Sequence, residues 1–385
     1  MPNHCQRPTS TGAWRVGRAT PAARDTVWAL VVGRGWALGV GGWELIKAAI
    51  VGMGWWGRTV VESVQSDSDV IRFVAGATRT VSPEVTAFAE AQTLTLAKDF
   101  NALLANKDID AVVLATPHSQ HTEQVIAAAQ AGKHVFCEKP FALTKADADA
   151  AVAATKKAGV TLGLGYNRRF HPEMTSLREK IRSGELGTVL HFEATMTFPN
   201  ALFLKPEAWR ADREETPCGG LTPMGVHAID GMIDLGGEID QVFCQSFRRV
   251  VQVDSDDTTS MLFRMKNGAS GYLGTITATG PGFSFQVFGS KGSLRLEGMT
   301  HVAGASSEER RTRLFSTAKW QPIKGPADTW EAARLDVTRA CLEAFATAAA
   351  GGPPFLIPAS EMIHGAAVTE AVVKSAASGR SEKIS

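Results

Sequence analysis

A glycine-rich turn is the first feature whose residue types and spacing indicate chemistry. Gly52, Gly54 and Gly57 form a G-x-G-x-x-G pattern between the apolar run Ala48–Val51 and a helical apolar face over residues 58–64. The first glycine permits a tight turn, the second lets backbone approach a pyrophosphate, and the third lets the helix pack on the strand. A helix N-terminus adds N–H groups and a positive dipole, so we expect a nicotinamide dinucleotide here. The residues expected around its pyrophosphate are Gly52, Met53, Gly54, Trp55, Trp56 and Gly57.

The end of the second predicted strand bears on which dinucleotide binds. An acidic residue about 20 positions after the turn would bind the ribose 2′-hydroxyl of NAD. This chain instead has Thr78 and Arg79 after the run Phe73–Ala77. No carboxylate repels a 2′-phosphate there, Thr78 can donate to it, and Arg79 can pair with it. The sequence therefore favours NADP over NAD, with a solvated surface charge as the alternative role of Arg79.

Two further polar loops follow apolar strands of the same predicted sheet. One leaves the strand Ala111–Ala115 and the other leaves the strand His134–Cys137. The carboxyl ends of parallel strands meet at one sheet edge, where ligands of such folds bind. We therefore expect these loops to border the nicotinamide, although a structural role at a helix start is the favoured alternative for His121. Their expected cofactor-binding residues are Thr116, Pro117, His118, His121, Glu138 and Lys139.

Short strands and helices alternate over residues 46–165, which predicts a doubly wound parallel sheet of the Rossmann type. Longer β-type segments follow, so residues 166–385 are expected to form an α+β domain with a mostly antiparallel open sheet. Helices over about Thr329–Ala350 and Ala359–Ala377 are expected to pack back toward the first domain. A broad open sheet face is often covered by another subunit, so we expect a homodimer or homotetramer.

Residues 1–45 stand apart from the rest of the chain. They lack a regular period, and their apolar part contains Arg34 and several glycines. A membrane span needs roughly 20 clean apolar residues, which this stretch does not offer. We interpret it as a disordered leader or a wrongly assigned start, with an export or organelle signal as the less favoured alternative.

Composition excludes several classes of partner. The chain of 385 residues has 40 basic and 39 acidic residues, so nothing indicates nucleic acid or a membrane as partner. Its five cysteines are scattered and form no CxxC pair, which is typical of reduced thiols in a cytoplasmic protein. No cluster has the spacing of metal ligands. A small-molecule substrate is the expected partner.

The combined motifs resemble those of the glucose–fructose oxidoreductase, inositol dehydrogenase and rhizopine-catabolism (Gfo/Idh/MocA) family. They are G-x-G-x-x-G, T-P-x-x-x-H, E-K-P and the run Tyr166–Phe170, and the resemblance extends from Ile46 to the end. It implies a Rossmann domain, a mostly antiparallel α/β domain and an active site between them. The lysine of E-K-P is typically catalytic, which points to Lys139, and Pro140 is expected to shape the backbone, with a cis bond as one option.

The resemblance also implies a glycine-rich segment that ends in D-x-x-x-H-x-x-D. His227 and Asp230 match it, whereas Pro223 replaces the first aspartate and removes a carboxylate. A histidine suits proton transfer near neutral pH, and a lysine can polarise a carbonyl or act as a base. We expect His227 to transfer the proton and Lys139 to orient and polarise, with exchanged roles left open. The expected substrate-binding residues are Lys139, Asn167, Arg168, His227 and Asp230.

Several roles and functions stay open at this stage. Asp230 can fix the imidazole tautomer or pair elsewhere, and Arg168 or Arg169 can form interdomain salt bridges instead of binding substrate. The resemblance implies hydride transfer between nicotinamide and a secondary alcohol or carbonyl of a sugar, polyol or related cyclic hydroxy compound. The alternatives are a dihydrodiol or aromatic-semialdehyde dehydrogenase, an NAD-dependent glycosidase and a non-catalytic cofactor-binding regulator.

Overall fold

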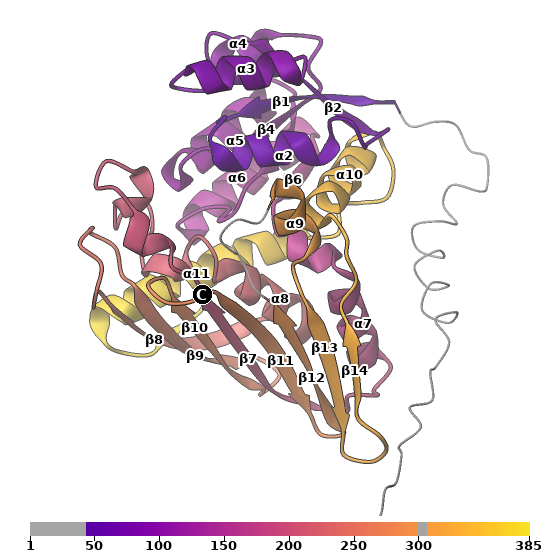
Figure 1. Ribbon diagram of the computed structural model, residues 1–385, viewed down its shortest axis with the longest axis vertical. Coiled ribbons are helices and arrows are strands. Elements are labelled where there is room, and N and C mark those ends of the chain that lie inside the picture. The colour runs from indigo at the N-terminus through magenta and orange to yellow at the C-terminus, as the bar shows by residue number, and fades with distance from the viewer. Residues whose placement is uncertain (1–43, 299–305) are drawn as a thin grey trace, which may run out of the picture. The chain divides into compact units, whose positions relative to one another are not determined.

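Two sheets organise the chain, as the computed structural model in Figure 1 shows. The structure describes residues 44–298 and 306–385, so nearly all of the leader predicted at 1–45 lies outside the described residues. One sheet has six strands and the other has nine.

The first sheet is parallel throughout, in the order β3-β2-β1-β4-β5-β6. The order reverses between β1 and β4, which creates a crevice outside their carboxyl ends where ligands of such sheets bind. The predicted doubly wound parallel sheet is therefore confirmed. Its strands are β1 (Ile46–Val51), β2 (Ile71–Ala77), β3 (Thr95–Leu96), β4 (Ala111–Leu114), β5 (His134–Cys137) and β6 (Leu162–Leu164).

Helices cover both faces of this sheet. Three of these helices, at residues 83–91, 100–105 and 145–158, begin at a side chain that accepts a backbone N–H group of the first turn, from Ser82, Asp99 and Thr144 respectively. The helices are α2 (Trp55–Val64), α3 (Pro83–Ala91), α4 (Phe100–Ala105), α5 (His121–Gln130) and α6 (Lys145–Ala158). A later helix, α10 (Val337–Ala349), adds Leu342 and Phe345 to the core on one face, where Phe345 meets Phe136 edge to face. The chain therefore returns to the first sheet after completing most of the second.

The second sheet has the order β14-β13-β12-β11-β7-β10-β9-β8-β15. Only β7 and β10 pair in parallel, so the predicted mostly antiparallel sheet is confirmed. Its strands are β7 (Val189–Thr197), β8 (Ile239–Phe247), β9 (Thr258–Met265), β10 (Ser270–Ile276), β11 (Gly282–Gly289), β12 (Gly292–Gly298), β13 (Thr317–Pro322), β14 (Asp328–Glu331) and β15 (Glu382–Lys383).

One face of the second sheet is covered by helices and the other is open. The helices α7 (Pro172–Arg182), α8 (Val226–Gly236) and α11 (Ala359–Ser378) share its core with residues such as Phe192. Side chains of β7 alternate between buried and partly exposed, as expected for a half-covered sheet. On the open face Leu190 and Leu262 keep 52% and 54% of their surface exposed.

The first of the two predicted C-terminal helices begins later than expected. Residues 329–331 belong to strand β14, which pairs with β13, and the helix starts at Val337. The Asp336 side chain accepts the N–H groups of Thr338 and Arg339 and so sets this start. A short helix, α9 (Ser307–Thr312), and strand β13 were not predicted. Among the helices of the described ranges, none is long and apolar enough to cross a membrane.

Candidate functional site

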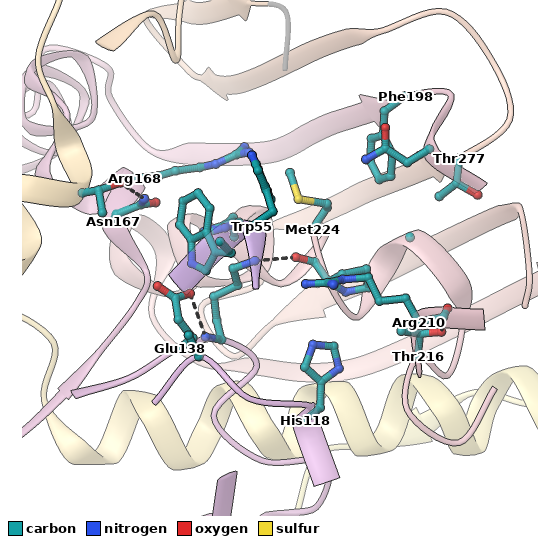
Figure 2. A pocket seen from close by; sticks show the side chains of 18 of the residues that line it. Trp55, His118, Glu138, Asn167, Arg168, Phe198, Arg210, Thr216, Met224 and Thr277 are labelled. Atoms are coloured by element: carbon teal, nitrogen blue, oxygen red, sulfur yellow. Dashed lines mark hydrogen bonds between the residues drawn. The ribbon is translucent and has the colours of Figure 1, made fainter. Parts of the chain in front are cut away.

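A cavity of about 640 Å³ is lined by loops of the first sheet and by segments that precede or belong to the second (Figure 2). The predicted residues that line it are Trp55, Trp56, His118, Glu138, Lys139, Asn167, Arg168 and His227. The predicted residues outside its lining are Gly52, Met53, Gly54, Gly57, Thr78, Arg79, Thr116, Pro117, His121 and Asp230. The structure thus brings both predicted catalytic residues, Lys139 and His227, to one cavity.

The glycine turn has the geometry that its spacing predicts. Gly52 has a φ of 92°, and a Cβ there would lie 2.5 Å from the carbonyl oxygen of Ala115. A Cβ on Gly57 would lie 1.9 Å from the carbonyl oxygen of Gly52, so helix and turn require this close approach. A Cβ on Gly54 would meet nothing within 4 Å. The turn therefore leaves open space beside Gly54 and the N-terminus of α2, which fits a pyrophosphate.

The three large residues of the turn do different things. Met53 is buried and its sulfur lies against Gly76 of β2, so only its backbone is available to a ligand. Trp55 is 47% exposed and Trp56 is partly buried, and their ring centroids lie 5.6 Å apart. Both indoles line the cavity, so the turn contributes an aromatic wall as well as backbone.

His121 links the two loops that follow β4 and β5. It is fully buried at the start of α5, with Nδ1 2.8 Å from the carbonyl oxygen of Pro140 and Nε2 3.1 Å from that of Thr116. Burial lowers its pKa, and the hydrogen bonds with the Pro140 and Thr116 carbonyl oxygens act in the opposite direction. The Lys139–Pro140 bond is cis, as the resemblance allowed. His121 thus has the structural role favoured for it and holds the loop that carries Lys139.

His118 closes the same side of the cavity. Its Nδ1 lies 2.7 Å from the carbonyl oxygen of Glu215, and its ring packs edge to face on Trp209 with centroids 4.8 Å apart. Burial holds its pKa well below the ordinary value, and the positive charges of Lys139 and Arg210 act in the same direction. His118 is therefore a neutral wall residue that joins the first-sheet loop to the segment before α8.

Lys139 extends into the cavity from the loop after β5. Its Nζ donates a hydrogen bond of 2.8 Å to the carbonyl oxygen of Pro223. Burial lowers the pKa of Lys139 to about 8, against the raising effect of Glu138, while Arg210 and Arg168 lower it further. The buried Glu138 has a raised pKa because of its burial. A lysine with a pKa near neutrality can donate a proton or accept one at physiological pH.

The departure at Pro223 has a defined consequence. The position that resembled an aspartate site touches Lys139 through its main-chain carbonyl, which every residue type provides. Proline therefore keeps an acceptor for the ammonium group but adds no negative charge beside it. His227 follows on the first turn of α8, is 7% exposed, and lies edge to face with Tyr166 at 6.0 Å.

Asp230 lies outside the cavity lining, away from its expected contact with substrate. Its carboxylate accepts hydrogen bonds of 2.6 and 2.8 Å from Arg169, and both side chains are almost fully buried. Arg169 also pairs with Glu361 of α11 and lies 3.6 Å from Asp234. Burial alone would lower the pKa of Arg169, but the three carboxylates raise it. The pair Arg169–Asp230 is thus a structural clamp between the segment after β6 and α8.

The neighbouring residues Asn167 and Arg168 line the cavity, as predicted. Asn167 Nδ2 donates a hydrogen bond of 3.1 Å to the hydroxyl of Thr338 at the start of α10. Arg168 is 6% exposed, and its guanidinium lies over the Phe283 ring at 4.7 Å from the centroid. Burial lowers the pKa of Arg168 to about 9.

Much of the opposite side of the cavity was not predicted residue by residue. The segment between β7 and α8 contributes Phe198, Asn200, Ala201, Leu204, Arg210, Thr216, Gly219, Gly220, Pro223 and Met224. Ion pairs such as that of Arg213 with Asp256 hold this segment on the second sheet. Residues 198–215 have no periodic pattern in the sequence that would identify these lining residues. The residues of α9 that line the cavity, such as Arg311, carried no signal either.

Thr78 and Arg79 lie at the carboxyl end of β2, away from the cavity. Thr78 is partly buried and Arg79 is exposed, on the strand next to the glycine turn. This is the edge at which the adenosine end of a dinucleotide lies in a sheet of this order.

Four cysteines, Cys137, Cys218, Cys244 and Cys341, are buried and form no disulfide in the described part of the chain. Within residues 44–298 and 306–385, no group of three or more His, Cys, Asp or Glu is arranged to hold a metal ion.

Comparisons with known proteins agree with this architecture. A family model described as an oxidoreductase family with an NAD-binding Rossmann fold matches residues 46–166, and a GFO/IDH/MocA C-terminal domain model matches residues 174–295. The myo-inositol 2-dehydrogenase of Thermotoga maritima is 32% identical over 228 residues, which cover 56% of this chain and 65% of that protein. The matched segment thus spans just under two thirds of that relative.

Two further relatives cover more of their own length. The rhizopine catabolism protein MocA of Rhizobium meliloti is 30% identical over 275 residues, which cover 69% of this chain and 76% of that protein. The crystal structure of an aldose-aldose oxidoreductase from Caulobacter crescentus, complexed with glycerol, superposes with a TM-score of 0.75 at 25% identity and covers 88% of this chain and 100% of that chain. The chain belongs to the Gfo/Idh/MocA family of oxidoreductases.

Proposed function

We propose that this protein is an NAD(P)-dependent oxidoreductase that transfers a hydride between nicotinamide and a secondary alcohol or carbonyl of a sugar, polyol or related cyclic hydroxy compound. The observation that carries the proposal is the meeting of Lys139 and His227 in one cavity with the indoles of the glycine turn. The names of the relatives, an inositol dehydrogenase and an aldose oxidoreductase, support the substrate class.

The residues around the turn fit a dinucleotide. The open space beside Gly54 and the N–H groups at the start of α2 suit a pyrophosphate. When bound, the nicotinamide supplies the hydride chemistry. Trp55 and Trp56 then form an aromatic wall beside the bound cofactor, and the loop held by His121 presents Lys139 to the substrate.

Lys139 and His227 handle the proton that accompanies the hydride. In the direction of carbonyl reduction, the Lys139 ammonium donates a hydrogen bond to the carbonyl oxygen and stabilises negative charge as it develops. His227 delivers the proton that completes the hydroxyl, and in oxidation it accepts that proton. Because the pKa of Lys139 is lowered to about 8, Lys139 can also relay the proton.

NADP is the preferred cofactor in this proposal. The support is the pair Thr78–Arg79 at the end of β2, where a carboxylate that selects NAD is missing from the sequence. Fluorescence titration is expected to give tighter binding of NADPH than of NADH. Arg79→Glu is expected to reverse the order, because its carboxylate repels the 2′-phosphate. Tighter binding of NADH by the unchanged protein would refute the preference.

The catalytic proposal is tested on the purified full-length chain. A panel of sugars and polyols is screened for absorbance change at 340 nm. Lys139→Ala and His227→Ala are each expected to lower kcat by about 10²- to 10⁴-fold while nucleotide affinity is retained. Lys156→Ala, an exposed lysine on α6, is the matched control and keeps full activity. Full turnover by either cavity variant would reject its assignment, and failure to bind both nucleotides would reject the proposed function.

We further propose that the open face of the second sheet pairs with a second copy of the chain. The half-exposed Leu190 and Leu262 on this face support a homo-oligomeric arrangement. Light scattering on the purified protein is expected to give a multiple of the chain mass.

A further inference from the structure

Arg168 is a buried cation whose charge has no carboxylate partner among the described residues. It is 6% exposed, and its Nη1 is buried without a hydrogen-bond partner in the part of the chain that the structure describes. The planar face of its guanidinium packs on the Phe283 ring, 4.7 Å from the centroid. This contact does not use the N–H donors at the edge of the guanidinium. A buried unpaired charge is costly, so an anionic partner that enters the cavity would remove this cost.

The adjacent Arg169 is a buried arginine with a structural role and serves as a comparison for Arg168. Arg169 is as buried as Arg168, but it is surrounded by Asp230, Asp234 and Glu361. Arg169 lies outside the cavity, whereas Arg168 lines it. The fold thus neutralises one arginine internally and leaves the charge of the other facing the space where substrate binds.

The charges around this space favour an anion. Arg210 also lines the cavity, stacks on Trp209 at 4.0 Å, and forms no ion pair within the described ranges. Arg168, Arg210 and Lys139 all line this cavity, and both arginines lower the pKa of Lys139. Figure 2 shows Arg168 and Arg210 on opposite sides of this space. Pro223 supplies no carboxylate to offset them, and Glu138 and Glu309 are the acidic residues of the lining.

We infer that the substrate carries a carboxylate, and that Arg168 binds this carboxylate while Lys139 and His227 act on a hydroxyl or carbonyl of the same molecule. The substrate class is thereby a sugar acid or a related hydroxylated carboxylic acid. A guanidinium matches a carboxylate with two parallel N–H donors, which makes it selective for such a group. This inference rests on the proposed function and narrows its substrate.

The dinucleotide pyrophosphate is the other possible anion, and the position of Arg168 argues against it. Phe283, on which the guanidinium lies, belongs to β11 of the second sheet, whereas the space for a pyrophosphate lies beside Gly54 of the first. Arg168 is therefore assigned to the substrate, and nucleotide affinity separates the two sources experimentally.

The test compares neutral sugars with their acids on the full-length protein at saturating NADP. The pairs are D-glucose with D-glucuronate and D-galactose with D-galacturonate, and the ratio of kcat/KM for acid over neutral sugar is measured. For at least one pair we expect a ratio of about ten or more. Arg168→Met is expected to lower this ratio by about tenfold or more, mainly through KM of the acid, and Arg168→Lys is expected to retain part of it.

Controls separate this inference from the proposed function. Arg182→Met removes an exposed arginine on α7 and is expected to leave the ratio unchanged. Ratios near one in the unchanged protein, or a ratio insensitive to Arg168→Met, overturn the inference while the proposed function stands. An NADPH dissociation constant raised about tenfold or more by Arg168→Met, with an unaltered ratio, assigns the guanidinium to the cofactor instead. Turnover of neutral polyols from the panel but of neither acid overturns the inference alone, whereas failure to bind both nucleotides overturns both proposals.

If Arg168→Met does not fold, Arg168→Lys and binding to the unchanged protein decide the question. In that case, the NADPH complex is expected to show a larger rise in Tm with the acid than with the equimolar neutral sugar. Equal rises in Tm would overturn the inference.

Discussion

Two of the walls of the cavity are built in different ways. The first wall consists of residues on loops that directly follow strands of the parallel sheet, with Trp55, His118, Lys139 and Arg168 as its main side chains. The second wall consists of residues 198–227, which run from the end of β7 into the first turn of α8. The strands fix the first wall, whereas the second is fixed by its own ion pairs and by three short 3₁₀ turns, Asn200–Phe203, Trp209–Ala211 and Gly219–Leu221.

This difference separates two tasks. Groups on the first wall keep their positions as long as the parallel sheet is intact, so they suit the steps that need fixed geometry. A long connection tolerates changes in sequence without loss of the sheet, so the second wall suits discrimination between substrates. Arg169 joins the two, because it lies in the segment after β6 and pairs with Asp230 of α8.

Loss of the Arg169–Asp230 ion pair is expected to give the largest effect, a decrease in the free energy of unfolding. Arg169→Met leaves the carboxylate of Asp230 buried without its partner, and loss of one member of a buried ion pair costs about 3–5 kcal/mol of unfolding free energy. Urea unfolding followed by tryptophan fluorescence measures this cost. Arg168→Met is the matched comparison and is expected to cost much less, because it removes no ion pair within the described residues. Equal losses for the two variants would contradict the structural role assigned to Arg169.

The two walls also differ in how far the sequence predicted them. The first wall was predicted because glycine spacing and apolar runs locate strand ends, and a parallel sheet brings such ends together. The prediction of Lys139 and His118 at the site follows from this rule. The meeting of His227 with Lys139 depended on the resemblance to the family, since spacing alone does not place α8 beside the loop after β5.

The second wall escaped prediction because its contacts are tertiary. Arg210 is held by stacking on Trp209, and Glu215 binds Ser119 of the first wall through a side-chain hydrogen bond of 2.5 Å. Neither contact has a periodic signal in the sequence. The resemblance to the family motif places Asp230 among the expected substrate-binding residues, but its side chain pairs with Arg169 instead. Helical spacing does not identify the partner across the core.

Two variants, one on each wall, test whether the first wall binds the cofactor and the second wall selects the substrate. Each is expected to change one binding constant by about tenfold. Gly54→Ala adds a Cβ where the structure has open space and φ is −66°, so stability is expected to be retained. Because that space suits the pyrophosphate, the NADPH dissociation constant is expected to rise. Asn200→Ala on the second wall is expected to raise substrate KM and to leave the NADPH dissociation constant within about twofold.

Fluorescence titration measures the NADPH dissociation constant, and steady-state kinetics measures the substrate KM. The reverse pattern, with Asn200→Ala weakening NADPH or Gly54→Ala raising only substrate KM, would refute the assignment of cofactor binding to the first wall. Gly57→Ala serves as a contrast to Gly54→Ala. It is expected to lower stability as well, since its Cβ would lie 1.9 Å from the carbonyl oxygen of Gly52.

The pH dependence of carbonyl reduction combines charges from both walls and gives the smallest expected change. Lys139 donates to the substrate in its protonated form, and its pKa is about 8. The value of kcat/KM should therefore fall by about fivefold between pH 8 and pH 9, as the protonated fraction falls. This fall is the alkaline limb of the pH profile. If Lys139→Arg retains activity, it should lack the alkaline limb, because a guanidinium stays protonated in this range.

Charged residues of the two walls are expected to shift the alkaline limb of the pH profile in opposite directions. Glu138 raises the pKa of Lys139, so Glu138→Gln is expected to shift the limb to lower pH. Arg210 lowers that pKa from the second wall, so Arg210→Met is expected to shift the limb to higher pH. If the pH at which kcat/KM falls does not change in either variant, the titration belongs to a group other than Lys139. If only Glu138→Gln shifts the alkaline limb, the first wall alone sets the pKa of Lys139. The second wall would then act on the substrate and not on Lys139.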